Sequence, residues 1–142
     1  MSDKYFLDTN IFVYSVDNAE PIKKVKSQAL ITDAINTGNG IISWQVIQEF
    51  LNVSSRKSFD SIKPSDVKAF FQKILNPLCE IYPDMNLYQY ALEIMDLTHY
   101  SFYDSLILAS AVKGECTILY SEDFQGGQVI RGVEVVNPFS AD

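Results

Sequence analysis

Acidic side chains follow the ends of two apolar runs in the sequence. Asp8 comes directly after the run Tyr5–Leu7, and the turn Ser121–Asp123 follows the run Cys116–Tyr120. If both runs are strands of a parallel sheet, their carboxyl ends lie at one rim, where such sheets bind ligands. An Asx turn at Asp8 and a solvated turn after the second run would explain the same residues without chemistry. These two signals therefore need support from other acids.

Asp104 heads the apolar stripe of a predicted helix. At about 100° per residue it shares a face with Ile107, Leu108 and Ala111. In the alternative interpretation, Ser101 and Asp104 form a capping box, and the acid stabilises the positive helix N-terminus. A carboxylate directed at the core is costly unless hydrogen bonds or a cation compensate it. A cation at the strand rim accounts for this position better than a cap alone.

Glu49 lies about one and a half turns into a predicted helix that Ser43 caps. It stands at the border of the buried stripe, with Val46 and Val53 on its apolar side. A group at this border can reach into a cleft, but a solvated surface Glu is equally common there. The residues around Glu49 leave both interpretations open.

Clustered carboxylates suit a hard divalent cation such as Mg²⁺ or Mn²⁺, which takes oxygen ligands. Such ions can polarise a phosphodiester, lower the pKa of a bound water and stabilise the leaving oxygen, so no protein nucleophile is needed. His99 is the single histidine, and the sequence has no GxSxG or GxxxxGK[ST] motif. The sequence therefore shows no motif for acyl transfer or for nucleoside triphosphate hydrolysis.

Strand-like and helix-like segments alternate along the chain, which predicts an α/β fold with a parallel sheet. Short apolar runs predict strands at residues 5–7, 40–43, 79–82, 116–120 and 133–136. Periodicity, proline and capping residues predict helices at residues 10–16, 21–35, 44–54, 64–75, 86–97 and 102–114. No repeat or long linker divides the chain, so we expect one domain over residues 1–142.

The composition limits the function further. A net charge of −7 and a sequence pI near 4.6 argue against a protein that grips phosphates along its whole surface. Cys79 and Cys116 fit no metal-ligand spacing, so we expect free thiols in a reducing compartment. No segment reaches the roughly 18 apolar residues of a membrane span. We therefore expect a cytoplasmic protein with no membrane partner.

Four segments, in this order, resemble the PIN-domain family, and most closely its VapC-type toxin ribonucleases of type II toxin–antitoxin systems. They are FLDTNIFVY (6–14), VIQEFLNV (46–53), SFYDSLILASA (101–111) and TILYSEDFQGG (117–127). The resemblance covers the chain from its first strand to its last turn signals. It implies a single PIN-like domain, an α/β/α sandwich, that binds Mg²⁺ or Mn²⁺ through an acidic quartet and cleaves RNA.

The resemblance assigns a role to each acid. Asp8, Asp104 and Asp123 are the implied metal ligands, and Glu49 orients or deprotonates the attacking water. Three polar neighbours support them by hydrogen bonds: Thr9, Asn10 and Ser121. Glu122 could assist or replace Asp123 if the turn is rotated, but the family pattern places the acid two residues after the serine.

The resemblance also implies an RNA substrate, a homodimer, and a cognate antitoxin whose C-terminal segment covers the acids. RNA needs local cations in so acidic a protein, and Arg56, Lys57 and the segment PIKKVK (21–26) are candidates. One alternative is a non-catalytic PIN-like or receiver-like module that holds a cation without turnover. An Asp-nucleophile phosphatase is a weaker alternative, because Asn10 replaces the second Asp of its DxDx[TV] motif.

Overall fold

The computed structural model describes residues 3–140, whose strands form one six-stranded sheet in the order β3-β2-β1-β4-β6-β5. The strands are β1 Tyr5–Leu7, β2 Gly40–Ser43, β3 Cys79–Ile81, β4 Ile118–Tyr120, β5 Val129–Ile130 and β6 Val133–Val136. β5 pairs antiparallel with β6, and the other neighbouring strands are parallel. The predicted parallel α/β fold is confirmed, with an antiparallel edge strand added. Positions 1–2 and 141–142 of the predicted domain lie outside the described residues.

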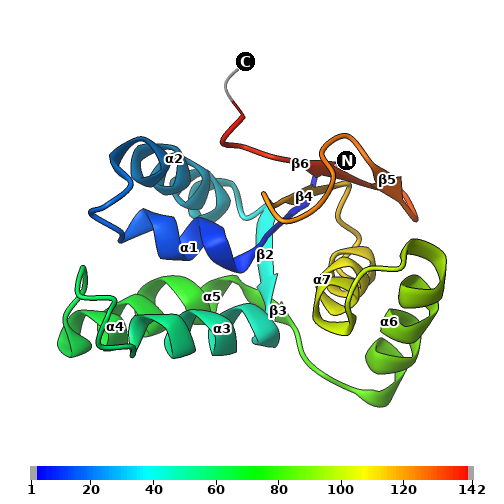
Figure 1. Cartoon of the computed structure of the whole chain (residues 1–142), viewed down its shortest axis with the longest axis horizontal. Helices are drawn as coiled ribbons and strands as arrows, with labels where there is room; N and C mark the ends of the chain where they lie inside the picture. Colours follow the sequence, from blue (N-terminus) through cyan, green and yellow to red (C-terminus); the bar gives the residue numbers. More distant parts are fainter. Residues whose placement is uncertain (1–2, 141–142) are drawn as a thin grey trace.

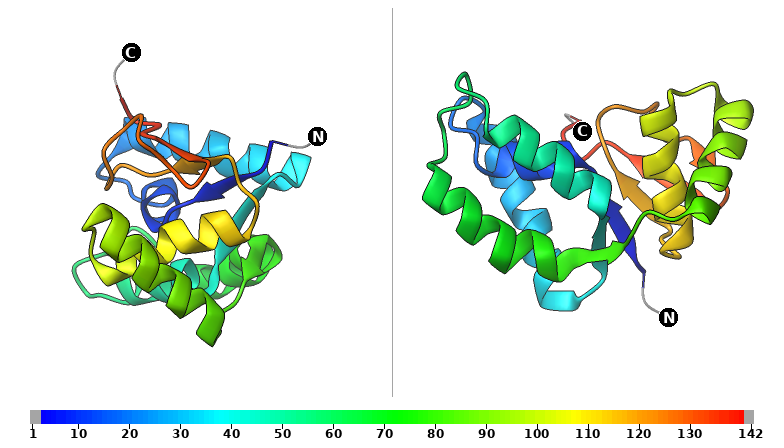
Figure 2. Two further views of the ribbon diagram at one scale, coloured as in Figure 1. Left: turned by 90° about the vertical axis from the view of Figure 1, so that its right-hand side faces the viewer. Right: turned by 90° about the horizontal axis from the view of Figure 1, so that it is seen from below.

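Helices cover both faces of this sheet (Figure 1 and Figure 2). They are α1 Thr9–Ser15, α2 Pro21–Thr37, α3 Trp44–Ser54, α4 Pro64–Phe70, the π-helical turn η1 Phe71–Leu75, α5 Asn76–Leu78, α6 Met85–Thr98 and α7 Phe102–Lys113. α1 to α5 lie on one side, whereas α6 and α7 pack against each other on the opposite side. The arrangement is the predicted α/β/α sandwich.

Several helix boundaries differ from the prediction for identifiable reasons. α6 begins one residue earlier than expected, because the Asp84 carboxylate caps it by accepting the Leu87 N–H at 2.7 Å. The expected helix over 64–75 widens into a π-helical turn before Pro77, which has no N–H to donate and whose ring opposes a regular α-helix. Ser43 holds the N-cap position of α3, but its hydroxyl makes no capping bond.

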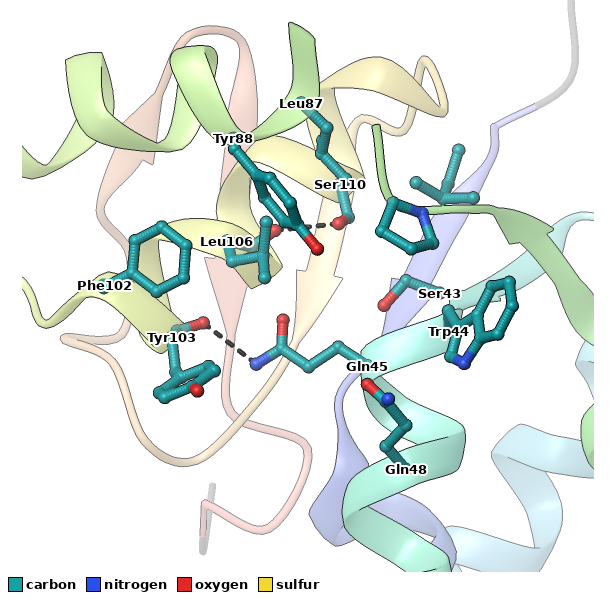
Figure 3. A pocket seen from close by; sticks show the side chains of 12 residues that line it. Ser43, Trp44, Gln45, Gln48, Leu87, Tyr88, Phe102, Tyr103, Leu106 and Ser110 are labelled. Atoms are coloured by element: carbon teal, nitrogen blue, oxygen red, sulfur yellow. Dashed lines mark hydrogen bonds between the residues drawn. The ribbon is translucent and has the colours of Figure 1, made fainter. Parts of the chain in front are cut away.

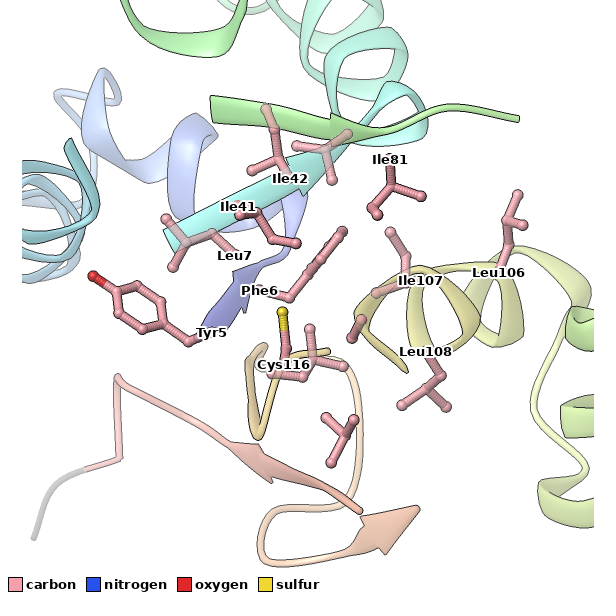
Figure 4. Packing of buried hydrophobic residues seen from close by; sticks show 14 of the residues in the cluster. Tyr5, Phe6, Leu7, Ile41, Ile42, Ile81, Leu106, Ile107, Leu108 and Cys116 are labelled. Carbon is pink, nitrogen blue, oxygen red and sulfur yellow. The ribbon is translucent and has the colours of Figure 1, made fainter. Parts of the chain in front are cut away.

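The central strands are buried on both faces. All residues of β1 and β2 are buried, including Phe6, Leu7, Ile41 and Ile42, which pack between the helix layers (Figure 4). Continuous burial follows from helices on both sides of a parallel sheet. Cys79 and Cys116 are both free, as their spacing predicted. Within residues 3–140, no helix has the length and apolar character needed to cross a membrane.

The register of the sheet brings two strand ends together. Leu7 at the end of β1 is paired with Tyr120 at the end of β4. The Asp8 N–H continues this pairing by donating to the Tyr120 carbonyl at 3.1 Å. The residues that follow the two strands therefore lie side by side at one rim of the sheet, as the sequence predicted.

Candidate active site

Asp8 stands between strand β1 and helix α1 and is 5% exposed. Its carboxylate accepts the Thr9 N–H at 2.7 Å and the Ser121 hydroxyl at 2.7 Å. Burial raises the pKa of the Asp8 carboxyl to about 7, although these two hydrogen bonds oppose the shift. The negative charges of Asp123 and Glu49 raise the pKa further. A buried carboxylate of this kind favours a nearby positive charge.

The turn after β4 supplies the next acid. Ser121 is buried, and its hydroxyl oxygen accepts the Asp123 N–H at 3.1 Å while donating to Asp8. The Asn10 amide nitrogen donates to both Asp123 carboxylate oxygens, at 3.2 and 3.3 Å. Desolvation raises the pKa of Asp123, with added contributions from the charges of Glu122 and two other acids. Asp8 and Asp123 thus share one hydrogen-bonded frame.

Glu122 faces Tyr14 and Lys23. Its carboxylate accepts from the Tyr14 hydroxyl and lies 3.2 Å from the Lys23 ammonium nitrogen. Lys23, one of the cations considered for RNA binding, is therefore paired with an acid of the protein itself. The structure places Asp123, rather than Glu122, beside Asp8.

Glu49 reaches the same rim from helix α3. The Thr9 hydroxyl donates to one of its carboxylate oxygens at 2.6 Å, and the Gln45 amide donates to the other at 3.3 Å. Glu49 is half-buried, as expected for a residue at the border of the apolar stripe. Of the two interpretations left open for Glu49, the structure shows the side chain that reaches into a cleft.

Asp104 lies in the first turn of α7 and serves two purposes. Its backbone N–H donates to the Ser101 hydroxyl at 3.2 Å, which is the capping bond considered for the sequence. Its side chain is partly exposed and lines the cleft, so the expected burial against the core is wrong. The first turn of α7 projects beyond the packed interior, and the apolar stripe begins only with the next residues.

The four acids line one cleft of about 310 Å³. Its walls are formed by Asp8, Thr9, Asn10, Gln45, Glu49, Asn52, Val53, Arg56, Asp104, Ile107 and Asp123. Its carboxylate and amide oxygens are the donors that Mg²⁺ and Mn²⁺ prefer, and a cation would offset the desolvation of Asp8. In the described part of the chain, however, no three acidic, histidine or cysteine side chains lie close enough to hold one ion together. The chemistry of the donor set fits such an ion.

The comparisons with known proteins agree with this architecture. The family model of the PIN domain matches residues 5–126. The chain belongs to the PIN-domain family. A comparison with curated proteins found no significant match.

Solved structures with the same fold include three bacterial proteins. A toxin–antitoxin complex from Klebsiella pneumoniae has a TM-score of 0.66 and 16% identity, covering 96% of this chain and 98% of that one. FitAcB from Neisseria gonorrhoeae has a TM-score of 0.69 and 17% identity, covering 95% and 98%. VapC20 from Mycobacterium tuberculosis, described as a toxin that cleaves the sarcin–ricin loop, has a TM-score of 0.60 and 19% identity, covering 84% and 90%. At these identities the likeness concerns the fold of the PIN domain.

Two residues of this PIN domain gained importance only in the structure. Gln45 is buried and links Glu49 to the Tyr103 carbonyl, to which its amide nitrogen donates at 3.1 Å. Its position one helical turn before Glu49 was the only signal in the sequence. Arg56 was one of several candidate cations, and the structure places it in the wall of the acid cleft.

Proposed function

We propose that this PIN domain is a Mg²⁺- or Mn²⁺-dependent endoribonuclease and the toxin of a toxin–antitoxin pair. One observation carries the proposal: acids from four separate segments of a PIN domain line a single cleft. Two of these acids, the buried Asp8 and the more exposed Asp123, have pKa values raised above their ordinary range, as groups at functional sites often have. The folds of toxin–antitoxin proteins, including one that cleaves RNA, add support.

In the proposed mechanism, Asp8, Asp104 and Asp123 would hold the cation. The bound ion would supply polarisation of the phosphodiester and a lowered pKa for the attacking water. Ser121 and the Thr9 N–H orient the Asp8 carboxylate, and Asn10 orients Asp123. These hydrogen bonds keep the ligands in place before RNA arrives.

Glu49 accepts the proton of the attacking water. Thr9 and Gln45 each engage one of its carboxylate oxygens, and both oxygens retain a further lone pair for a water. Arg56 supplies a positive charge at the wall of the cleft, where a phosphate of the substrate can pair with it. A single local cation of this kind is compatible with the acidic net charge of the whole chain.

The proposal includes protein partners. Large apolar side chains are exposed on α2 and on α6, among them Ile22, Val25, Met85 and Leu97. Exposed apolar side chains of this kind can pack against another protein when they gather on one helix face. We propose a homodimer that also binds an antitoxin, in the cytoplasm, where RNA is accessible and free thiols persist. Light scattering that finds a monomer at all concentrations would argue against the dimer.

One observation favours a second candidate function. Because no three acids of the described residues converge on a single point, the cleft could hold a cation loosely without turnover. Such a cation-binding interaction module would bind Mn²⁺ yet leave RNA intact. The cleavage assay separates it from the nuclease.

The test of the nuclease uses structured RNAs, purified protein, and either Mn²⁺ or EDTA. Cleavage should need Mn²⁺ or Mg²⁺, stop in EDTA and return when the ion is restored. Asp8→Ala should abolish it, whereas Asp3→Ala, an exposed acid before β1, should cleave like wild type. Undiminished cleavage in EDTA, or equal losses in both variants, would rule the mechanism out.

A further inference from the structure

A second cavity lies directly beside the acid cleft. It has a volume of about 420 Å³ and opens between the start of α3 and the helix pair α6 and α7 (Figure 3). Gln45 lines both this cavity and the acid cleft, so the two spaces adjoin at one side chain. The volume is in the range of sites that bind small planar ligands.

Aromatic side chains form much of its wall. Tyr88 and Phe102 lie on the side of α6 and α7, and Trp44 lies on the side of α3 (Figure 3). Trp44 is 45% exposed and Tyr103 is 65% exposed, so neither residue is buried in the core. Exposed aromatic faces around a recess are the surfaces on which unpaired nucleobases stack.

Two buried polar atoms of the cavity wall have no hydrogen-bond partner within the described residues. They are the Ser43 hydroxyl and the Gln45 side-chain oxygen, on residues that are 2% and 8% exposed. The orientation of the Gln45 amide is fixed, because its nitrogen donates to the Tyr103 carbonyl and the Glu49 carboxylate, which can only accept. The Gln45 oxygen is therefore an acceptor in the wall of the cavity, which the Ser43 hydroxyl also lines (Figure 3).

We propose that this cavity binds one unpaired nucleobase of the RNA, next to the phosphodiester that the acid cleft cuts. The inference rests on the proposed nuclease function and adds a recognition site to it. A base supplies a planar ring for the aromatic wall and an N–H on its Watson–Crick edge for the Gln45 oxygen. The Ser43 hydroxyl can donate to or accept from a second atom of the same edge.

The chemistry of the wall favours a base over other ligands. No charged residue is among those that line the cavity in the described chain, which disfavours a phosphate. A phosphate also has no donor for the Gln45 oxygen, and an apolar side chain of a protein partner would leave both polar atoms unpaired. Because Gln45 also holds Glu49, a base seated here would be positioned against the proton-accepting side of the cleft.

Trp44 allows a direct test, since it is the single tryptophan of the chain and gives one indole N–H signal in an NMR spectrum. Metal-free protein is titrated with each of the four nucleoside 5′-monophosphates and with ribose 5-phosphate, which has no base. We expect a saturable shift of the indole signal with at least one nucleotide and none with ribose 5-phosphate.

Three variants sharpen this titration. Ser43→Ala and Tyr88→Ala should each weaken nucleotide binding by at least about 5-fold. Ser43 makes no capping bond, and Tyr88 is partly exposed, so both variants should fold. Tyr90→Ala is the matched control, because Tyr90 lies on the same helix but lines a different cavity, and it should bind like wild type.

The inference is overturned if no nucleotide moves the Trp44 signal, or if ribose 5-phosphate moves it equally. It is also overturned if dilution of the free protein moves the signal and nucleotide moves it no further, because a second copy of the chain would then fill the cavity. RNA cleavage without nucleotide binding would contradict the proposed base site and support the proposed nuclease. Nucleotide binding without metal-dependent cleavage would support the proposed base site and contradict the proposed nuclease.

Discussion

The acid cleft has two halves that hold their carboxylates in different ways. At the strand rim, Ser121 donates a hydrogen bond to Asp8, and Asn10 donates one to Asp123. In each pair the two residues are more than 100 positions apart in the sequence. On the helix side, Glu49 and Asp104 are partly exposed, and the Asp104 side chain contributes no bond to its own cap. The pKa values of both rim carboxyls are raised, although Asp8 is buried and Asp123 is exposed. On the helix side, Glu49 accepts hydrogen bonds from Thr9 and Gln45, whereas the Asp104 side chain retains freedom to move. A cation would join three acids that are held by hydrogen bonds, Asp8, Asp123 and Glu49, to the freer side chain of Asp104.

The largest difference in activity is expected between variants of the two neighbouring acids in the turn after β4. Asp123→Asn should reduce RNA cleavage by at least about 100-fold, because it removes an acid that lines the cleft. Glu122→Gln should stay within about 3-fold of wild type, since Glu122 faces Lys23 and Tyr14. Initial rates at saturating Mn²⁺ measure both. Equal losses would mean that the turn rotates on metal binding.

The desolvation of Asp8 makes the metal-free fold depend on pH. Its folded pKa of about 7 lies above the ordinary value of 3.8, so between these pH values the folded state holds a proton that the unfolded state has lost. The protonated Asp8 carboxyl therefore contributes stability to the folded state. This contribution is complete below the pKa of the unfolded state and is lost as the pH rises through the folded pKa of about 7. Asp8→Asn should therefore be more stable than wild type at pH 8 in EDTA, by on the order of 2–4 kcal/mol.

Urea unfolding of wild type and Asp8→Asn at pH 5 and pH 8 checks this expectation. The difference between the two proteins should grow with pH. Asp3→Asn provides the control for removing one negative charge from an exposed position. An Asp8→Asn protein that is less stable than wild type at pH 8 would show that its hydrogen bonds outweigh desolvation.

Ser121→Ala tests the frame that joins the rim acids. It removes the donor to Asp8 and leaves the Asp123 N–H without its partner, which should cost about 1–3 kcal/mol. Since the Ser121 bond lowers the pKa of Asp8, its loss should raise that pKa and move the onset of Mn²⁺-dependent cleavage to higher pH. A pH–rate profile that matches wild type would show that Ser121 does not orient Asp8.

The smallest effect on stability is expected for Asp104→Asn. The cap of α7 is made by the Ser101 hydroxyl and the Asp104 backbone N–H, both of which remain. The metal-free variant should unfold within about 0.5 kcal/mol of wild type, while its cleavage is lost. Ser101→Ala is the contrasting variant, because it removes the cap itself and should cost about 1 kcal/mol. If Asp104→Asn is the less stable of the two, the capping interpretation is the stronger one.

The sequence predicted the strand ends and the order of the acids, because apolar runs and capping residues are local signals. The edge strand β5 was missed, since it has two residues and is formed by a tight turn in which Arg131 and Gly132 both have positive φ. Burial was harder to predict. Asp104 was expected to be directed at the core and is partly exposed, whereas Asp8 is buried among residues that only the sheet register brings near.

The role of Gln45 depended entirely on tertiary contacts. Nothing in its local pattern shows that its amide would bridge Glu49 on its own helix and the Tyr103 carbonyl on another. The direction of Glu122 was also undecided, because a turn residue can face either side until its partners are known. Lys23 and Tyr14 decide it, and both come from the first two helices.

Binding of Mn²⁺, followed by the loss of the free-ion EPR signal, tests most directly whether the two halves act on one ion. Wild type, Asp8→Asn and Asp104→Asn would be titrated under the same conditions, with Asp3→Asn as the control for charge. We predict that wild type and Asp3→Asn bind Mn²⁺ alike, and that removal of either cleft acid weakens binding by at least about 10-fold. Wild-type affinity in Asp104→Asn would contradict a shared ion site and, with it, the nuclease mechanism proposed for this cleft.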